Sequence, residues 1–175
     1  MRETEIKFRL DSFEEMERRL EALGCEAGPE LRQTSMLLDG DHRHLGRSGR
    51  TLRVRVSGNR LFLTAKSAES SDGLAKQRHE REVEVRSDLG ELLSLLELLG
   101  YRVCLIYHRT RRQFALGRAT VCLDRMDFGT YMEIEAGSLK DLRRACDSLG
   151  LDLSQGDTRS YPELMELHGA GREEK

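Results

Sequence analysis

The sequence is poor in aromatic side chains: it has no tryptophan, and phenylalanine and tyrosine make up only 5% of its 175 residues. Proteins that hold single-stranded nucleic acid commonly stack its bases on aromatic rings, so this composition argues against such a partner. The net charge is only −2 although 34% of the residues are charged. Bulk charge therefore indicates neither a nucleic-acid nor a membrane partner, and an anion site would have to come from local clusters of lysine and arginine.

Several other features are missing. No apolar run approaches the length of a membrane span, and the charged start at Met1 to Glu3 is unlike a secretory signal, so we expect a cytoplasmic protein. The sequence shows no Walker-type glycine loop and no Ser-His-Asp or Cys-His arrangement. Its scattered cysteines form no C-x-x-C pair, which argues against a zinc site or a disulfide framework and predicts reduced, mostly buried thiols; they are Cys25, Cys104, Cys122 and Cys146.

The first ten residues alternate between charged and apolar side chains. Glu3, Glu5 and Lys7 alternate with Ile6 and Phe8. Because successive side chains of a strand point to opposite faces, this order predicts one ionic and one apolar face. Carboxylates two residues apart lie about 6.6 Å from each other at Cα, so both can reach one hydrated cation. A single pattern of this kind is more commonly a half-exposed strand with its polar side in water, and repetition is needed to favour a site.

The pattern is repeated twice. Glu80 and Glu82 precede a leucine-rich segment, and Glu133 and Glu135 precede another amphipathic one. In all three cases a Glu-x-Glu strand leads through a Ser or Asp cap into a helix that ends at Leu-Gly. The expected helices run from about Phe13 to Leu23, from Asp88 to Gly100 and from Ser138 to Leu149.

Basic residues share strand faces between these acidic strands. Arg53 and Arg55 lie on one face of a strand, and the turn signal at Ser57 to Asn59 predicts a hairpin that brings Lys66 beside them. Arg109 and Arg111 share a face of a later strand. Guanidinium groups that point the same way can clamp phosphate or carboxylate oxygens. The stretch 67–76, rich in Ser, Gly and charge, predicts a surface loop.

About eight alternating strands with short turns suit a closed antiparallel sheet. We therefore predict a β-dominated α+β fold, in which helices cover the apolar outside of an eight-stranded barrel and the charged faces line its inside. One domain is expected over 1–167, with a flexible tail over 168–175. The predicted inner face consists of Glu3, Glu5, Lys7, Arg53, Arg55, Lys66, Glu80, Glu82, Arg109, Arg111, Asp124, Glu133 and Glu135.

The mixture of signs on this face indicates a particular chemistry. A metal-bound polyphosphate needs bases for its oxygens and acids for the cations, and Mg²⁺ or Mn²⁺ is normally held by carboxylates, phosphates and water. Phosphoryl or nucleotidyl transfer then depends mainly on positioning and charge stabilisation. The expected cofactor is Mg²⁺ or Mn²⁺.

The order of the motifs resembles that of one known family. The chain is similar to the CYTH superfamily, or triphosphate tunnel metalloenzymes, and most similar to its class IV (CyaB-type) adenylate cyclase branch. The matching motifs are Glu3-x-Glu5-x-Lys7, Gln33 with Asp39, Leu52-Arg53-Val54-Arg55, Leu63-Thr64-Ala65-Lys66, Arg78-x-Glu80-x-Glu82, Arg109-x-Arg111-x-x-Phe114, Leu123-Asp124, Gly129-x-Tyr131-x-Glu133-Ile134-Glu135, Leu149-Gly150-Leu151 and Ser160-Tyr161-x-Glu163-Leu164. The pattern departs from the family at Ser35, at Leu37 and in the turn 127–131.

The resemblance implies roles for the inner face. Glu3, Glu5, Glu133 and Glu135 would bind metal, supported by Asp124 and by Glu80 or Glu82, although the register leaves Glu82 and Glu84 as the alternative pair. The triphosphate would be bound by Lys7, Arg53, Arg55, Lys66, Arg109 and Arg111. The residues expected to act in catalysis are Glu5, Lys66 and Glu82.

Two reactions fit this set. The resemblance implies foremost an adenylate cyclase, in which the 3′-hydroxyl of ATP attacks the α-phosphorus and releases pyrophosphate. The alternative is hydrolysis of a terminal phosphate of tripolyphosphate, thiamine triphosphate or a nucleotide, and a non-catalytic polyphosphate or nucleotide sensor is the third reading. We expect no nucleic-acid or membrane partner and allow for a homodimer. His42 and His44, on a polar loop, are interpreted as solvated rather than as metal ligands.

Overall fold

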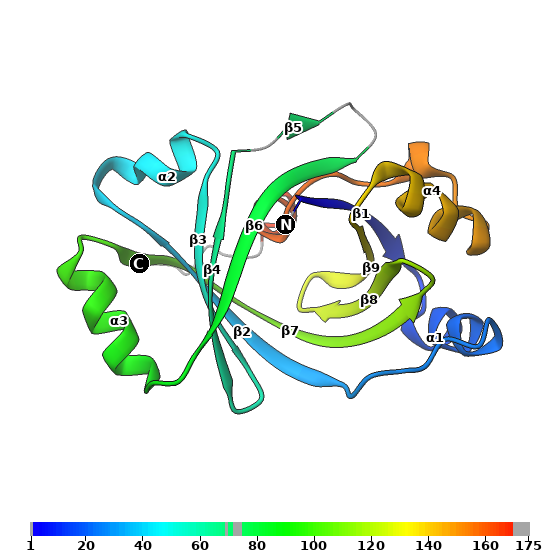
Figure 1. The fold of residues 1–175 in the computed structure, drawn as a ribbon, viewed down its shortest axis with the longest axis horizontal. Coiled ribbons are helices and arrows are strands. Elements are labelled where there is room, and N and C mark those ends of the chain that lie inside the picture. The colour runs from blue at the N-terminus through cyan, green and yellow to red at the C-terminus, as the bar shows by residue number, and fades with distance from the viewer. Residues whose placement is uncertain (1, 69, 72–74, 170–175) are drawn as a thin grey trace.

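Eight antiparallel strands close into a barrel in the computed structural model, which describes residues 2–68, 70–71 and 75–169 (Figure 1). The strand order is β1-β9-β8-β7-β2-β3-β4-β6, and pairing of β6 with β1 closes the ring, as predicted. A two-residue strand, β5, is added to β6. The strands are β1 (Arg2–Leu10), β2 (Leu31–Asp39), β3 (Thr51–Ser57), β4 (Arg60–Lys66), β5 (Ser70–Ser71), β6 (Lys76–Val85), β7 (Arg102–Leu116), β8 (Ala119–Met126) and β9 (Gly129–Ala136).

Three helices follow the three acidic strands, which confirms the repeat. They are α1 (Phe13–Ala22), α3 (Leu89–Leu98) and α4 (Leu139–Ser148). Their N-termini are capped by the side chains of Ser12, Asp88 and Ser138, which accept hydrogen bonds from backbone N–H groups of the first turn. Each helix is followed by a glycine with positive φ, a conformation that a Cβ atom would disfavour.

The helices cover the outside of the barrel at two places (Figure 1). Helices α1 and α4 pack on the outer face of β1, β8 and β9, where Ile6, Val121 and Ile134 are fully buried. Helix α3 covers the outer face of β2, β3 and β4 around Val54 and Leu61. The apolar faces of the strands are therefore turned outward under helices, and the polar faces are left to line the interior. None of the described helices is long and apolar enough to cross a membrane.

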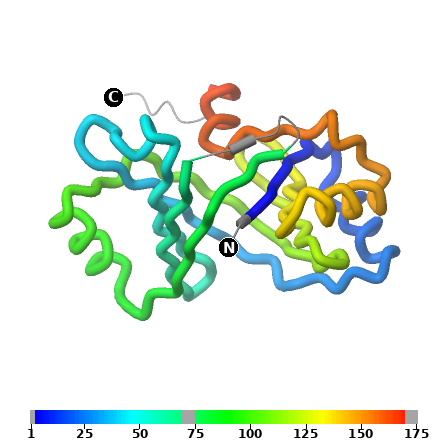
Figure 2. Tube along the Cα trace, turned by 45° about the horizontal axis from the view of Figure 1, so that its top comes forward, coloured from blue at the N-terminus to red at the C-terminus, as the bar shows by residue number. Residues whose placement is uncertain are grey.

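Short helical elements had no counterpart in the sequence-based prediction. The segment interpreted as the loop 40–44 contains the 3₁₀ turn η1 (Asp41–Arg43) and helix α2 (His44–Arg47), and η2 (Leu153–Gln155) precedes helix α5 (Tyr161–Leu167). These helices have at most seven residues, too few for a hydrophobic period to be recognised. In Figure 2, α2 in cyan and α5 in orange-red lie at the same end of the barrel.

The predicted C-terminal bound of the loop 67–76 is wrong. Residues 69 and 72–74 lie outside the described part of the chain, but β6 begins at Lys76, which is fully buried. The sequence predicts this strand over Arg78 to Arg86, and it starts two residues earlier because β1 continues the ladder, with Glu5 opposite Lys76 and Glu3 opposite Arg78. Of the predicted tail, His168 stacks on Phe128, and residues 170–175 are not among the described ones. The cysteines are free, and three of the four are buried, as predicted.

Candidate functional site

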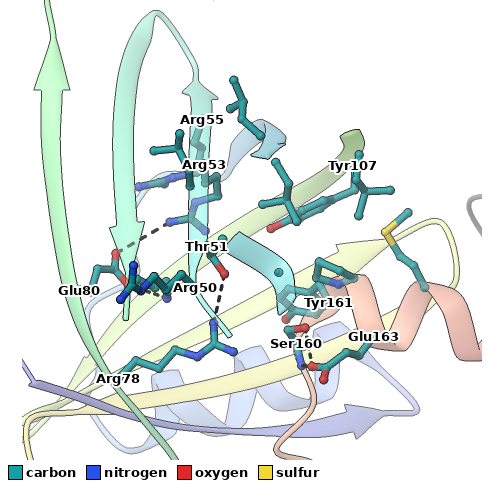
Figure 3. Close-up of a pocket in the computed structure, with 18 of the residues that line it drawn as sticks. Arg50, Thr51, Arg53, Arg55, Arg78, Glu80, Tyr107, Ser160, Tyr161 and Glu163 are labelled. Carbon is teal, nitrogen blue, oxygen red and sulfur yellow. Dashed lines mark hydrogen bonds and ion pairs between the residues drawn. The ribbon is translucent and has the colours of Figure 1, made fainter. Parts of the chain in front are cut away.

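One cavity of about 1150 Å³ runs through the barrel and gathers the predicted inner face. The alternation of the strands directs charged side chains into it from β1, β3, β4, β6, β7 and β9. Figure 3 shows Arg53 and Arg55 of β3 and Glu80 of β6 among them. Twelve of the thirteen predicted residues line this cavity: Glu3, Glu5, Lys7, Arg53, Arg55, Lys66, Glu80, Glu82, Arg109, Arg111, Glu133 and Glu135.

Asp124, the thirteenth, lies behind the lining. It is fully buried and accepts hydrogen bonds from Nε and Nη2 of Arg111, both at 2.6 Å. The Tyr161 hydroxyl donates to the same carboxylate at 2.5 Å, and Arg109 lies 3.5 Å away. Two parallel bonds from a guanidinium fix its plane, so in this arrangement Asp124 orients arginines rather than facing the cavity.

Lys7 and Arg111 form the buried ionic centre of the site with Glu133. The Lys7 ammonium lies 2.6 Å from Glu133 and 3.3 Å from Glu5, and Arg111 donates to both Glu133 and Glu135. Burial disfavours the charge on Lys7, but the carboxylates of Glu133 and Glu5 outweigh it and raise the pKa of Lys7. The charged forms of these buried side chains are therefore stabilised by their mutual ion pairs.

Glu82 organises the arginines of β3. Its carboxylate accepts hydrogen bonds from Arg55 at 2.7 Å, from Arg53 at 3.3 Å and from the Thr64 hydroxyl at 2.7 Å. Glu84, two residues further along β6, is exposed and pairs with Arg60 outside the cavity. The structure thus places Glu80 and Glu82, and not Glu84, at the cavity.

Three carboxylates surround Lys66 in the cavity. The Lys66 ammonium lies 2.5 Å from Glu80, 3.0 Å from Glu3 and 3.8 Å from Glu5, so three carboxylates already converge on one positive charge. In the described part of the chain, no three His, Cys, Asp or Glu side chains lie in a geometry that would hold a metal ion, because the carboxylates are drawn onto lysine and arginine.

The charge balance nevertheless favours added cations. The predicted residues that line the cavity comprise six carboxylates and six cations, a balanced set with no excess positive charge for an entering polyphosphate. Burial, with the neighbouring Glu80, raises the pKa of Glu3 to about 7, and burial, with Glu133, raises that of Glu135 to about 8. The residues present therefore fit a divalent cation, and Glu3, Glu5, Glu80 and Glu135 are the ones that would hold it.

This crowding predicts a pH-dependent stability of the metal-free protein. Glutamates of an unfolded chain titrate near pH 4.3, so the folded state holds the protons of Glu3 and Glu135 more tightly. Their stabilising contribution is complete below about pH 4.3 and is lost as the pH rises through 7 to 8. In EDTA, the melting temperature should fall between pH 6.5 and 8.5, and saturating Mg²⁺ should remove the difference. Equal melting temperatures at both pH values in EDTA would contradict this assignment.

The sequence-based prediction gave no role to several residues around the site, although Gln33 and Tyr161 belong to its motifs. Gln33 accepts a hydrogen bond from Arg109 at 2.8 Å, and the ring of Tyr161 is flanked by the Lys7 ammonium and the Arg109 guanidinium, 5.2 and 5.7 Å from its centroid. Tyr107 lies in the cavity with Arg53 and Arg109 near its hydroxyl, and these guanidiniums lower its pKa although burial opposes them. Tyr107 is two residues before Arg109, so the same period of two could have identified it. The predicted solvation of His42 and His44 agrees with their exposure.

Comparisons with known proteins agree with this geometry. The family model described as CYTH domain matches residues 1–161. A solved structure from Vibrio parahaemolyticus, described as a candidate adenylate cyclase, has a TM-score of 0.81 at 20% identity, covering 94% of this chain and 97% of its own. The PH1012 protein from Pyrococcus horikoshii OT3 has a TM-score of 0.78 at 26% identity, covering 93% and 98%.

A third solved structure comes from Hippeastrum. It is described as a candidate adenylyl cyclase with a dominant triphosphatase activity, and it has a TM-score of 0.71 at 19% identity, covering 95% of this chain and 96% of its own. None of the curated proteins matches the sequence. Because the family model spans the whole barrel and nearly the whole chain, and the predicted ionic residues line the barrel interior, the chain belongs to the CYTH domain family.

Proposed function

We propose that this protein is a divalent-metal-dependent enzyme that hydrolyses a triphosphate inside its tunnel. The observation that carries this proposal is the convergence of six cations and six carboxylates of the predicted set on one cavity. The phosphate groups of a triphosphate find their partners in the cations, and the divalent ions that accompany it find theirs in the carboxylates.

Each side chain has a defined task in this proposal. Lys7, Arg53, Arg55, Lys66, Arg109 and Arg111 bind phosphate oxygens and neutralise the charge that develops on the leaving phosphate. Asp124 and Glu133 keep Arg111 and Lys7 in place, and Glu82 does the same for Arg53 and Arg55. A divalent cation, when bound by the carboxylates around Lys66, would neutralise phosphate charge and lower the pKa of a water nucleophile.

Hydrolysis is favoured over cyclisation because no aromatic ring that the structure describes in the cavity is available to stack on an adenine. Among the described residues that line the cavity, the aromatic ones are Tyr107 and Tyr161. Both rings are buried, with 6% of Tyr107 and 4% of Tyr161 exposed, and Lys7 and Arg109 already contact the Tyr161 ring, so neither ring presents an open face to an adenine. The Hippeastrum relative, described as having a dominant triphosphatase activity, supports the same choice.

Cyclisation of ATP, the reaction that the resemblance implies foremost, remains the second candidate. Apolar side chains of Leu37, Leu105 and Met165 line part of the cavity and could receive a base. Incubation with Mg²⁺ or Mn²⁺ and, separately, tripolyphosphate, thiamine triphosphate and ATP separates the two reactions. Orthophosphate without cyclic AMP supports hydrolysis, cyclic AMP with pyrophosphate supports the cyclase, and no turnover of any substrate would contradict both.

Substitution of Arg55 tests the phosphate clamp. Arg55→Ala should raise KM for tripolyphosphate by about 10-fold or more, because it removes charge-assisted hydrogen bonds worth about 1.5–3 kcal/mol. Arg60→Ala is a matched control: Arg60 contacts the same Phe62 ring, at 4.8 Å against 4.7 Å for Arg55, but does not line the cavity. Steady-state kinetics of both variants should show the loss only for Arg55, and equal KM values would remove Arg55 from the site.

A further inference from the structure

Three arginines at the edge of the cavity are not used by the triphosphate site. Arg43, Arg47 and Arg50 lie on the segment that joins β2 to β3, line the same cavity and are exposed. Within the described ranges, none of the three makes an ion pair with a carboxylate, whereas each of the six tunnel cations has at least one carboxylate partner. The charge of these three side chains is therefore available to an anion from solution.

The segment that carries them is built to a fixed shape. The carboxylate of Asp39 accepts hydrogen bonds from the backbone N–H groups of Gly40 at 2.8 Å, Leu45 at 2.9 Å and Gly46 at 2.9 Å. These three bonds close the turn around one side chain at the end of β2. Arg43 lies within this turn, and Arg47 and Arg50 follow it. All three arginines therefore project from a segment whose backbone is restrained by hydrogen bonds.

The backbone of this segment also departs from the common conformations. His42 and Arg43 have positive φ values of 60° and 53°, the only positive values among the described non-glycine residues. Side chains with a Cβ atom are disfavoured there, and such strained residues are concentrated at binding and switching sites. Arg43 is thus held in an unfavourable conformation while its side chain lines the cavity.

The position of the three arginines continues the phosphate clamp outward. Arg50 directly precedes β3, whose Arg53 and Arg55 line the tunnel, and Figure 3 shows Arg50 near Thr51 and Arg78 on one side of the cavity. Planar guanidiniums bind phosphate oxygens two at a time. We infer that Arg43, Arg47 and Arg50 form a second phosphate subsite, which binds the phosphoryl groups beyond the third of a linear inorganic polyphosphate.

This inference rests on the proposed function and adds a chain-length preference to it. Exposed arginines could instead attract every anion to the opening and raise all association rates alike. The two explanations differ in one respect. General attraction depends on the net charge of the protein and would also fall when exposed arginines elsewhere are removed, whereas a subsite beyond the third phosphate depends on Arg43, Arg47 and Arg50 themselves.

The test compares tripolyphosphate with a linear polyphosphate of about 15 phosphates, at equal chain concentration and ionic strength, since both have two chain ends. In the wild-type protein, kcat/KM per chain should be at least about 10-fold higher for the longer substrate. The triple variant Arg43→Gln, Arg47→Gln, Arg50→Gln should lose this preference and keep its kcat/KM for tripolyphosphate within about twofold. Titration calorimetry of both polyphosphates with Ca²⁺ as the divalent cation gives the same comparison for binding.

A second triple variant controls for net charge. Arg32→Gln, Arg81→Gln, Arg143→Gln removes three exposed arginines that do not line the cavity and should leave the preference intact. An equal loss for both substrates in the first variant, or no wild-type preference for the longer chain, would overturn the subsite while leaving the triphosphatase proposal standing. Absence of both binding and hydrolysis of tripolyphosphate in the wild-type protein would instead overturn the proposed function, and the subsite with it.

Discussion

Exchange of Glu5 for glutamine should lower kcat for triphosphate turnover by at least about 100-fold, and leave the barrel folded. The amide keeps the shape of the side chain but removes the negative charge that faces Lys66 at 3.8 Å and Lys7 at 3.3 Å. A cation site among Glu3, Glu5, Glu80 and Glu135 would lose one of its charges, whereas Lys7 would keep Glu133 as its partner at 2.6 Å.

Glu84→Gln provides the control for this loss. Glu84 lies on the same face of β6 as Glu80 and Glu82, but it is exposed and pairs with Arg60. The kcat of the Glu84→Gln variant should stay within about twofold of the wild type, because an exposed ion pair contributes little to stability and Glu84 does not face the cavity. Comparable rates for Glu5→Gln and the wild type, measured at saturating Mg²⁺, would contradict the metal-dependent tunnel.

The largest effect on stability is expected from Arg111→Met. This change leaves the buried carboxylates of Asp124, Glu133 and Glu135 without their shared guanidinium. Removal of one partner from a buried ionic cluster typically destabilises a protein by about 3–5 kcal/mol. For a chain of this size, each kcal/mol lowers the melting temperature by roughly 2–4 °C, so a loss of about 10 °C should be seen.

Urea unfolding of Arg111→Met and of Arg102→Met separates burial from charge. Arg102 is exposed and lies 3.8 Å from Glu97 at the surface, so its loss should change the free energy of unfolding by less than about 1 kcal/mol. If the free energy of unfolding of Arg111→Met also changed by less than about 1 kcal/mol, the buried carboxylates would not be stabilised by Arg111.

The strand faces and the ionic set could be predicted because both depend on local order. The period of two in Glu3-x-Glu5-x-Lys7 and in Arg53-x-Arg55 decides which side chains share a face, and the structure places all of these in the cavity. Burial of the apolar partners then decides which face is turned inward. The capping residues and the Leu-Gly ends likewise placed α1, α3 and α4 to within one or two residues of their observed bounds.

The depth at which a side chain is buried, and its contacts with residues distant in the sequence, could not be predicted in this way. The pattern placed Asp124 on the inner face, but it could not show that Arg111 and Tyr161 cover it. The strand start at Lys76 depends on pairing with Glu5, and Arg50 reaches the cavity because of a tied turn outside any strand. These features are set by tertiary partners, which a pattern along one segment does not contain.

The double pairing of β1 has a consequence for protein synthesis. Glu5 lies opposite Lys76 on β6 and opposite Glu135 on β9, so β1 needs β9, which is synthesised later, before both of its edges are paired. Contacts between residues so distant in the chain form slowly, because a long loop must first be closed. During translation β1 therefore remains an exposed edge that can pair with other chains, and the ring of carboxylates is completed only after β9 has emerged.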